Sequence, residues 1–142
     1  MRTDVVKAAR AWIDTPYRHQ HSTKGRGCDC LGLVRGVWRD VVGPEPERAP
    51  SYSPSWGEGS VVDHLVDAAS RNMTRVPVSD MQPGDVLILR MLPTAPAKHC
   101  AIYSGDGKMI HAYQGANRVV EHSMADWWRR KIVGVFRFPE KV

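Results

Sequence analysis

The chain has 142 residues, of which 42% are hydrophobic, so it is long enough for one globular domain with a core, and we expect residues 1–142 to form a single domain. Its formal charge of +5 is scattered over single basic residues and short groups, which argues against nucleic-acid binding. Three cysteines are an odd number and do not suggest a disulfide scaffold, so at least one free thiol is expected.

The N-terminal residues predict an amphipathic helix from Asp4 to Ile13, with Thr3 as its cap and Thr15-Pro16 at its end. The polar segment from Tyr17 to His21 is predicted to be a loop. Because no continuous apolar segment opens the chain, neither a secretory signal peptide nor a transmembrane span is predicted. We therefore expect a protein made in the cytoplasm, unless something else carries it out of the cell.

A second helix is predicted from about Asp29 to Val42, following a glycine-containing loop. Cys30 then lies in the first turn, where unpaired amides and the helix dipole lower a thiol pKa from about 8.5 into roughly the 3.5–7.5 range. Cys30 is thus a candidate nucleophile, although a buried cysteine that fills the core is an equally good interpretation of this segment alone. Gly32 is expected to let another backbone or a substrate approach the helix closely.

The second helix is predicted to end at Gly43-Pro44. The proline-rich residues from Pro44 to Gly59 predict an extended surface loop, which either shapes specificity or merely connects two elements. Ser60 is the expected cap of a third helix. Its buried face is predicted to consist of Val61, Val62, Leu65, Val66 and Ala69.

The second half of the chain predicts an antiparallel sheet, so the fold class is α+β. A glycine-containing hairpin turn is expected over Ser104–Gly107, and a short helix or turn over Met124–Arg130. The predicted strands are Val86–Leu89, Lys98–Tyr103, Lys108–Ala112, Arg118–Glu121 and Ile132–Phe138.

His99 and His111 lie on the two strands that this hairpin turn joins. With the turn centred near residue 105, they are predicted to face one another across the ladder, with Cβ atoms about 4.5–5.5 Å apart. His111 could then bond one nitrogen of His99 while the other nitrogen faces Cys30. A thiolate that attacks a carbonyl needs such a base and such an orienting partner.

Several ordered motifs resemble the NlpC family of papain-like cysteine peptidases, which cut bacterial cell-wall peptides. The resemblance runs from Trp12 to Phe138 and implies N-terminal helices packed on a C-terminal antiparallel sheet, with no cofactor. The motifs are Asp29-Cys30-x-Gly32-Leu33-Val34, Pro83-Gly84-Asp85-Val86, His99-x-Ala101-Ile102-Tyr103 and Gly107-Lys108-Met109-Ile110-His111-Ala112.

By this resemblance, Cys30 is the nucleophile, His99 the general base and acid, and His111 the orienting third residue. Tyr17 matches the family tyrosine that helps to stabilise the oxyanion. The implied substrate is a peptidoglycan stem peptide, cut between D-γ-glutamate and a diamino acid.

The residues around Cys30 resemble most the compact members of phage tails and phage-like gene transfer particles. The implied partners are tail or baseplate proteins, and the implied role is local opening of the cell wall during DNA delivery. Leu31 replaces a usual serine, and Arg18-His19-Gln20 replaces an aromatic-glycine-glycine stretch, which bears on specificity more than on the reaction.

Alternatives at the level of function are a catalytically silent structural or binding module of a particle, and an amidase or acyltransferase of the same fold. Cys28 and Cys30, with His99, Cys100 and His111, offer enough nitrogen and sulfur for a tetrahedral zinc site. The Cys-x-Cys spacing is tight, however, and His99 and Cys100 should point to opposite faces, so no metal is expected.

The remaining candidate side chains are expected to have structural roles. Cys28 and Cys100 are predicted to be packed thiols, and Trp127-Trp128 a core and edge pair rather than a sugar-stacking platform. Solvated or capping roles are expected for His19, His21, His64 and His122.

Overall fold

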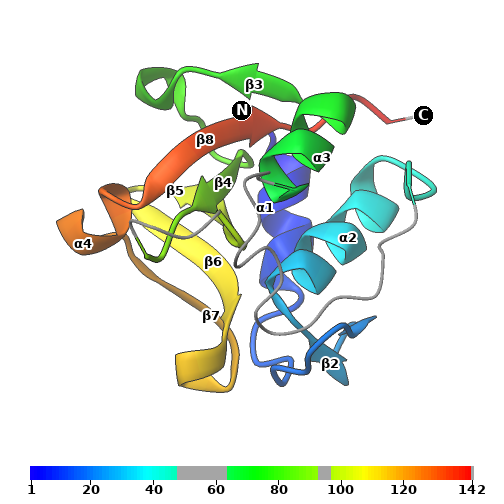
Figure 1. Cartoon of the computed structure of the whole chain (residues 1–142). Helices are drawn as coiled ribbons and strands as arrows, with labels where there is room; N and C mark the ends of the chain where they lie inside the picture. The colour runs from blue at the N-terminus through cyan, green and yellow to red at the C-terminus, as the bar shows by residue number, and fades with distance from the viewer. Residues whose placement is uncertain (48–63, 93–96, 142) are drawn as a thin grey trace.

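The computed structural model describes residues 1–47, 64–92 and 97–141, and within them helices precede a six-stranded sheet (Figure 1). The strand order is β3-β8-β4-β5-β6-β7, and each neighbouring pair is antiparallel. The predicted α+β class is therefore confirmed. The helices are α1 (Thr3–Arg10), α2 (Cys30–Val41), α3 (His64–Asn72) and α4 (Asp126–Arg129), and the sheet strands are β3 (Thr74–Val76), β4 (Val86–Leu89), β5 (His99–Gly105), β6 (Lys108–Tyr113), β7 (Arg118–Ser123) and β8 (Ile132–Arg137).

The two faces of the sheet carry separate hydrophobic clusters. One face packs against α1 and α2, where Val5 and Leu33 meet Ile102 and Ile110 of the strands. The other face carries a smaller cluster that includes Leu87, Leu89, Ala101, Met109 and Val135, with Trp128 of α4 packed against it. In Figure 1, α1 and α2 lie on one side of the sheet and α4 lies at its far end.

The first helix is shorter than predicted. It ends at Arg10, after which the amides of Trp12 and Ile13 bond the carbonyls three residues before them instead of four. The helix tightens in this way before it reaches Pro16. Thr3 is not its cap, because Arg2 occupies that position and makes no side-chain capping bond.

Five short elements were not predicted from the sequence, and one of them is the edge strand β3. The expected polar loop before α2 contains a two-stranded ladder of β1 (Ser22–Thr23) and β2 (Gly27–Cys28). Single 3₁₀ turns, η1 (Val78–Asp80) and η2 (Gln114–Ala116), precede β4 and β7.

The middle of the chain can be compared with its prediction only in part. The predicted loop to Gly59 is described as far as Glu47, and the predicted cap Ser60, with Val61 and Val62, lies outside the described residues. From His64 onward a helix is present, and Leu65 is its buried residue.

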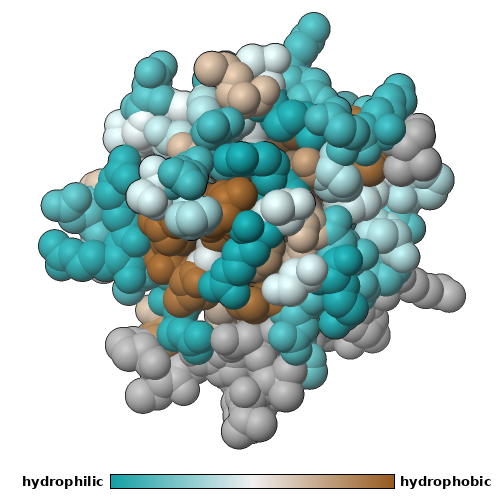
Figure 2. Space-filling model, turned by 90° about the horizontal axis from the view of Figure 1, so that it is seen from above, coloured by the Kyte–Doolittle hydropathy of each residue, from teal (hydrophilic) through white to brown (hydrophobic). Residues whose placement is uncertain are grey.

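Most of the visible surface is polar. Seen from the side where α3 and β3 lie, hydrophilic residues cover most of the face, and hydrophobic residues gather near its middle (Figure 2). Among the described residues, no helix has the length and hydrophobicity that a bilayer span requires.

Candidate active site

The first turn of α2 is capped by Asp29, whose side chain is almost completely buried. One carboxylate oxygen accepts the amide of Gly32 at 2.8 Å, and the other accepts the amide of Gln20 at 2.8 Å. A carboxylate that accepts first-turn amides is a strong helix start. Cys30 is therefore the first residue of the helix, as the sequence predicted.

Gly32 is the position where another segment of backbone approaches α2. A Cβ atom at this position would overlap the carbonyl oxygen of His21. Ser22 Oγ also donates to the Gly32 carbonyl at 2.6 Å. The predicted close approach is thus made by the chain itself, through the segment that precedes β1.

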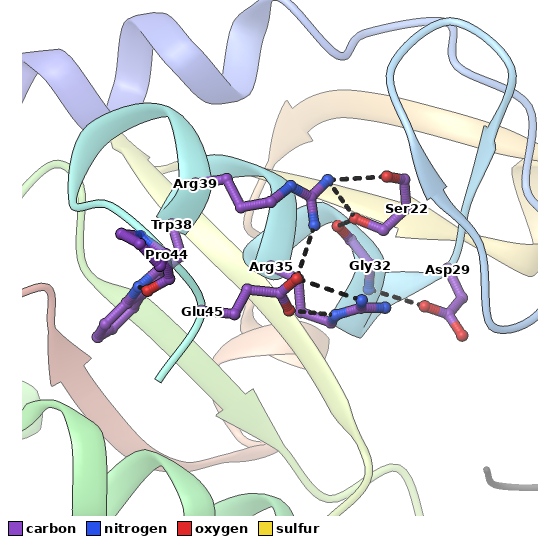
Figure 3. A network of polar contacts seen from close by, with 8 residues as sticks. All are labelled: Ser22, Asp29, Gly32, Arg35, Trp38, Arg39, Pro44 and Glu45. Carbon is purple, nitrogen blue, oxygen red and sulfur yellow. Dashed lines mark hydrogen bonds and ion pairs between the residues drawn. The ribbon is translucent and has the colours of Figure 1, made fainter. Parts of the chain in front are cut away.

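A network of charged groups holds α2 to its neighbouring segments (Figure 3). Glu45 accepts hydrogen bonds from Arg35 at 2.6 Å and from Arg39 at 3.1 Å. Arg39 also donates to the carbonyl and hydroxyl oxygens of Ser22, and Trp38 Nε1 donates to the carbonyl of Pro44. The helix that carries Cys30 is therefore held by polar contacts both to Ser22, in the segment before it, and to Pro44 and Glu45, in the segment after it.

The Cys30 thiol lies partly exposed at the start of β5 and has a pKa well below its usual value. Hydrogen bonds from Cys100 and from His99 favour its thiolate, and they outweigh burial, which acts in the opposite direction. In the thiol form, Sγ is also 3.7 Å from the carbonyl oxygen of Lys98, which accepts from it. Cys30 therefore ionises more readily than an ordinary cysteine.

Cys100 is more than the packed thiol that was predicted. It is a free, buried thiol, and its interaction with Cys30, together with burial, raises its own pKa well above the usual value. It therefore stays protonated and acts as a donor to the neighbouring thiolate.

His99 and His111 are in direct contact, with 2.7 Å between Nε2 of His99 and Nδ1 of His111. The sequence predicted that the two residues lie directly opposite one another, and in the structure they do not. Gly105 pairs with Lys108 and Ile102 with Ile110, so the turn is centred after residue 105. Continued along the strands, this register puts Ala101 and not His99 opposite His111. The two histidines are diagonal neighbours on one face, a separation that long or aromatic side chains can bridge.

His122 extends this contact to a third strand, which corrects the expected solvated or capping role. Its Nε2 is 2.8 Å from Nε2 of His111, and its Nδ1 is 2.9 Å from the carbonyl oxygen of Ser123. Because β7 places His122 opposite Met109, all three rings lie on the face away from α1 and α2.

His111 is completely buried in an aromatic environment. The ring of Tyr113 stacks on it with centroids 5.1 Å apart, and Trp128 contacts it edge-on at 5.0 Å. Burial, together with His99 and His122, lowers the pKa of His111 to about 2. His111 is therefore a neutral ring with one donor and one acceptor nitrogen.

Tyr17 lies half-buried beside the candidate nucleophile. Its amide donates to the carbonyl of Asn117 at 2.8 Å, and it forms a bridge with Cys28 of β2. Burial and the negative charge that develops on Cys30 raise the pKa of Tyr17 to about 12. Its hydroxyl therefore keeps its proton and can act as a donor.

Two further candidates from the sequence, Cys28 and His19, lie outside the row of histidines. Cys28 is completely buried, and burial raises the pKa of its thiol to about 12. His19 lies 3.9 Å from a carboxylate oxygen of Asp29. Within residues 1–47, 64–92 and 97–141, no group of three or more His, Cys, Asp or Glu side chains is arranged to hold a metal ion.

Trp127 and Trp128 form an edge-to-face pair, but only Trp128 belongs to the packed part of the structure. Trp128 contacts the rings of His99, His111 and His122, whereas Trp127 is 52% exposed beside Lys131.

A cavity of about 360 Å³ opens between α2, α3 and strands β4 and β5. Leu31 and Cys100, which flank Cys30, belong to its lining, as do Glu45 and Glu47 from the segment after α2. The cavity therefore comes close to Cys30 through Leu31 and Cys100, whereas Cys30, His99 and Tyr17 are not among its lining residues.

The sequence profile of the NlpC/P60 family matches residues 14–137. The chain belongs to the NlpC/P60 family. Members of this family are cysteine peptidases that act on peptidoglycan, so the prediction of a papain-like peptidase family from the ordered motifs is confirmed.

Curated relatives of this NlpC/P60 chain include enzymes and a phage protein. It is 28% identical over 134 residues to gamma-DL-glutamyl hydrolase of Bacillus subtilis strain 168, covering 94% of the chain and 29% of that protein. It is 29% identical to murein DD-endopeptidase MepH of Escherichia coli K12, covering 88% of the chain and 41% of MepH. Tail tip assembly protein K of Escherichia phage lambda is 30% identical, with 72% of the chain and 50% of that protein covered. The chain thus spans half the length or less of these relatives.

Solved structures show the same fold. The NlpC/p60 domain of the peptidoglycan hydrolase SagA superposes with a TM-score of 0.70 at 25% identity, covering 97% of this NlpC/P60 chain and 99% of that one. The peptidoglycan hydrolase RipB of Mycobacterium tuberculosis gives a TM-score of 0.67 at 20% identity, covering 97% of this chain and 64% of that one.

Two residues of the site were missed as participants by sequence reasoning, namely Cys100 and His122. Cys100 adjoins His99 in sequence, but its contact with Cys30 comes from the packing of α2 on β5. His122 could have been found by extending the hairpin argument to the next strand, because β6 and β7 also pair in a continuous antiparallel register.

Proposed function

We propose that residues 1–142 act as a single domain, a cysteine endopeptidase that hydrolyses peptidoglycan stem peptides. The observation that carries this proposal is the arrangement of three side chains from different elements. Cys30 begins α2 with a pKa that its interaction with His99 helps to lower, and Nδ1 of His111 lies 2.7 Å from Nε2 of His99. Such an arrangement suits nucleophilic attack by a thiolate on an acyl carbon.

The proposed roles follow from this geometry. The Cys30 thiolate attacks the carbonyl carbon, and His99 holds the thiol proton and later gives it to the leaving amine. The resulting acyl-enzyme is hydrolysed by a water that His99 activates. His111 is neutral and keeps the ring of His99 oriented.

The negative oxygen formed during attack needs nearby donors. The Tyr17 hydroxyl is a suitable one, because its raised pKa keeps it protonated while Cys30 is ionised. Backbone amides in the first turn of α2, including that of Cys30, supply the others. Donors of this kind at a helix start are a common basis for oxyanion stabilisation.

The proposed bond joins D-γ-glutamate to a diamino acid. Support comes from the similarity to gamma-DL-glutamyl hydrolase, although the similarity to a murein DD-endopeptidase makes the choice of bond a direct question for experiment. The cavity beside Leu31 and Cys100 is the proposed place for part of the peptide, because these two residues neighbour Cys30 in sequence and in space.

We also propose that the peptidase works as part of a phage tail or a phage-like particle. The similarity to tail tip assembly protein K of phage lambda supports this setting. The expected partners are tail or baseplate proteins, and the expected task is a local opening in the cell wall.

The proposal is tested by digesting purified peptidoglycan with the wild-type protein and with Cys30→Ala, and identifying the released fragments by mass spectrometry. The wild type should release stem-peptide fragments cut at the γ-glutamyl bond, and Cys30→Ala should release none. Cys28→Ala removes a buried thiol instead and should retain cleavage.

Other outcomes point to the alternatives. Equal absence of fragments with wild type and Cys30→Ala would contradict the peptidase proposal and favour a silent structural module. Products of transfer to another acceptor, or cleavage of other acyl groups, would favour an acyltransferase or amidase.

A further inference from the structure

Three histidines form a continuous row of ring-to-ring contacts across β5, β6 and β7. His99 and His111 are joined at 2.7 Å, and His111 and His122 at 2.8 Å. At the outer end, Nδ1 of His122 lies 2.9 Å from the carbonyl oxygen of Ser123. The row therefore connects Cys30 at one end with a backbone carbonyl at the other.

The Ser123 carbonyl determines the direction of each hydrogen bond in this row. A carbonyl oxygen can only accept, so Nδ1 of His122 carries a hydrogen, and whenever the ring is neutral its Nε2 is an acceptor. Nε2 of His111 must then donate to His122, which leaves Nδ1 of His111 as the acceptor for His99. Nε2 of His99 donates to it, so Nδ1 of His99 is the nitrogen left with a lone pair for the Cys30 proton.

His111 depends on a protein acceptor at its outer nitrogen. Its ring is fully buried, and Tyr113 and Trp128 hold it from two directions. A buried N–H that loses its acceptor is costly, about 1–3 kcal/mol in general. His122 supplies that acceptor, and its own ring is held 5.5 Å from that of Trp128.

We propose that His122 is a positioning residue, which fixes the tautomer of His111 and through it holds His99 in the form that accepts the proton of Cys30. This inference rests on the proposed peptidase function, in which His99 is the base. Without His122, His111 can carry its hydrogen on Nδ1 and donate to Nε2 of His99. That arrangement opposes the imidazolium form of His99 and hence the thiolate form of Cys30.

Two substitutions separate this role from simple packing. His122→Phe keeps a ring of similar shape against Trp128 but has no acceptor for His111. His122→Gln loses the ring but provides a carbonyl oxygen that can accept from Nε2 of His111. Glu121→Gln is the matched control on β7, because Glu121 points to the other face and bonds Arg10 of α1.

The readout is the rate of Cys30 alkylation by iodoacetamide as a function of pH, together with kcat and KM on stem peptides. In His122→Phe the alkylation midpoint should rise by roughly half to one pH unit, and kcat should fall roughly threefold to tenfold with KM unchanged. His122→Gln and Glu121→Gln should keep the wild-type midpoint. Thermal unfolding of each variant establishes that the fold is intact.

An unchanged midpoint in a folded His122→Phe would overturn the proposal, as would equal losses in His122→Phe and His122→Gln. Alkylation needs no substrate, so this test stays decisive even if the protein proves unable to cut peptidoglycan. Failure of the peptidase proposal and failure of the positioning role are therefore distinguishable.

Discussion

The reactivity of Cys30 depends on two neighbours that come from the same strand. His99 and Cys100 both donate to the sulfur, and each favours its thiolate form. A thiol donor beside a thiolate is unusual, because the two sulfurs compete for one proton. Here Cys100 has the raised pKa and Cys30 the lowered one, so the charge rests on the partly exposed sulfur.

Removing the donor at position 100 should weaken the thiolate. In Cys100→Ala, the pKa of Cys30 should rise by roughly one unit, since hydrogen bonds to charged groups are worth about 1.5–3 kcal/mol. Cys100→Ser keeps a hydroxyl donor in the same place and should stay closer to the wild type. The measurement is the pH dependence of Cys30 alkylation, and an unchanged midpoint in Cys100→Ala would show that Cys100 is only a packed thiol.

At the scale of elements, α2 is positioned by groups that serve no chemical role. Asp29 caps its start, and Glu45 binds Arg35 and Arg39 along its length. The helix can also lie close to the segment before β1, because Gly32 has no side chain to meet the His21 carbonyl. The place of the sulfur is therefore set by contacts on several sides of the helix.

Gly32→Ala should destabilise the protein by about 1–3 kcal/mol, as overpacking in a tight contact generally does. In an isolated helix the same change stabilises by about 1 kcal/mol, so the sign of the effect is informative. The free energy of unfolding in urea measures it. Asp40→Ala on the exposed side of α2 serves as control and should change it by less than about 0.5 kcal/mol. A stabilised Gly32→Ala would argue against the close contact with His21.

At the scale of the whole molecule, the buried His111 links the site to the pH dependence of folding. The folded protein keeps His111 neutral down to a pKa of about 2, whereas the unfolded chain binds a proton there below about 6.5. The unfolded state thus binds more protons between these pH values. The contribution of His111 to the free energy of unfolding is therefore fully present above pH 6.5 and is lost progressively as the pH falls.

The expected slope from His111 approaches 1.4 kcal/mol per pH unit at pH values well below 6.5. Glu121, whose pKa is lowered by its hydrogen bond with Arg10, loses its stabilising contribution only at pH values below about 4.5, so the interval from pH 6.5 to 5 reports on histidine. Urea unfolding across that interval should give a shallower slope for His111→Asn than for the wild type. Calorimetric proton uptake on unfolding at pH 5.5 checks the same point in the wild type alone, and no uptake would contradict it.

Local signals explain which parts of the site could be predicted from the sequence. The capping aspartate and the apolar spacing of α2 placed Cys30 in the first turn, and the glycines of the hairpin turn placed His99 and His111 on neighbouring strands. Their exact register was missed because Gly105 pairs with Lys108, so the turn is centred between Asp106 and Gly107 and not near residue 105; Gly105, Asp106 and Gly107 all adopt positive φ there.

The contacts that were missed depend on packing between distant segments. The contact between the Cys100 and Cys30 side chains requires α2 to dock on β5. No periodic pattern in the sequence indicates that these two segments lie side by side. β1, β2 and β3 have two or three residues each, too few to show an alternation. His122 was interpreted without its cross-strand neighbours, and so its contact with His111 was overlooked.

The three histidines and the sulfur of Cys30 belong to parts of the chain that lie far apart in sequence. Strands β5 to β7 follow one another through short turns, so the row can assemble from local pairing. Cys30 joins it only when α2 settles on the sheet, across a sequence separation of 68 residues to its contact at Lys98. Before this long-range contact forms, Cys30 lacks the interactions with Cys100 and His99 that lower the pKa of its thiol. For the peptidase proposed above, a copy in which α2 has not docked on the sheet lacks the side-chain arrangement that cleaves the peptide.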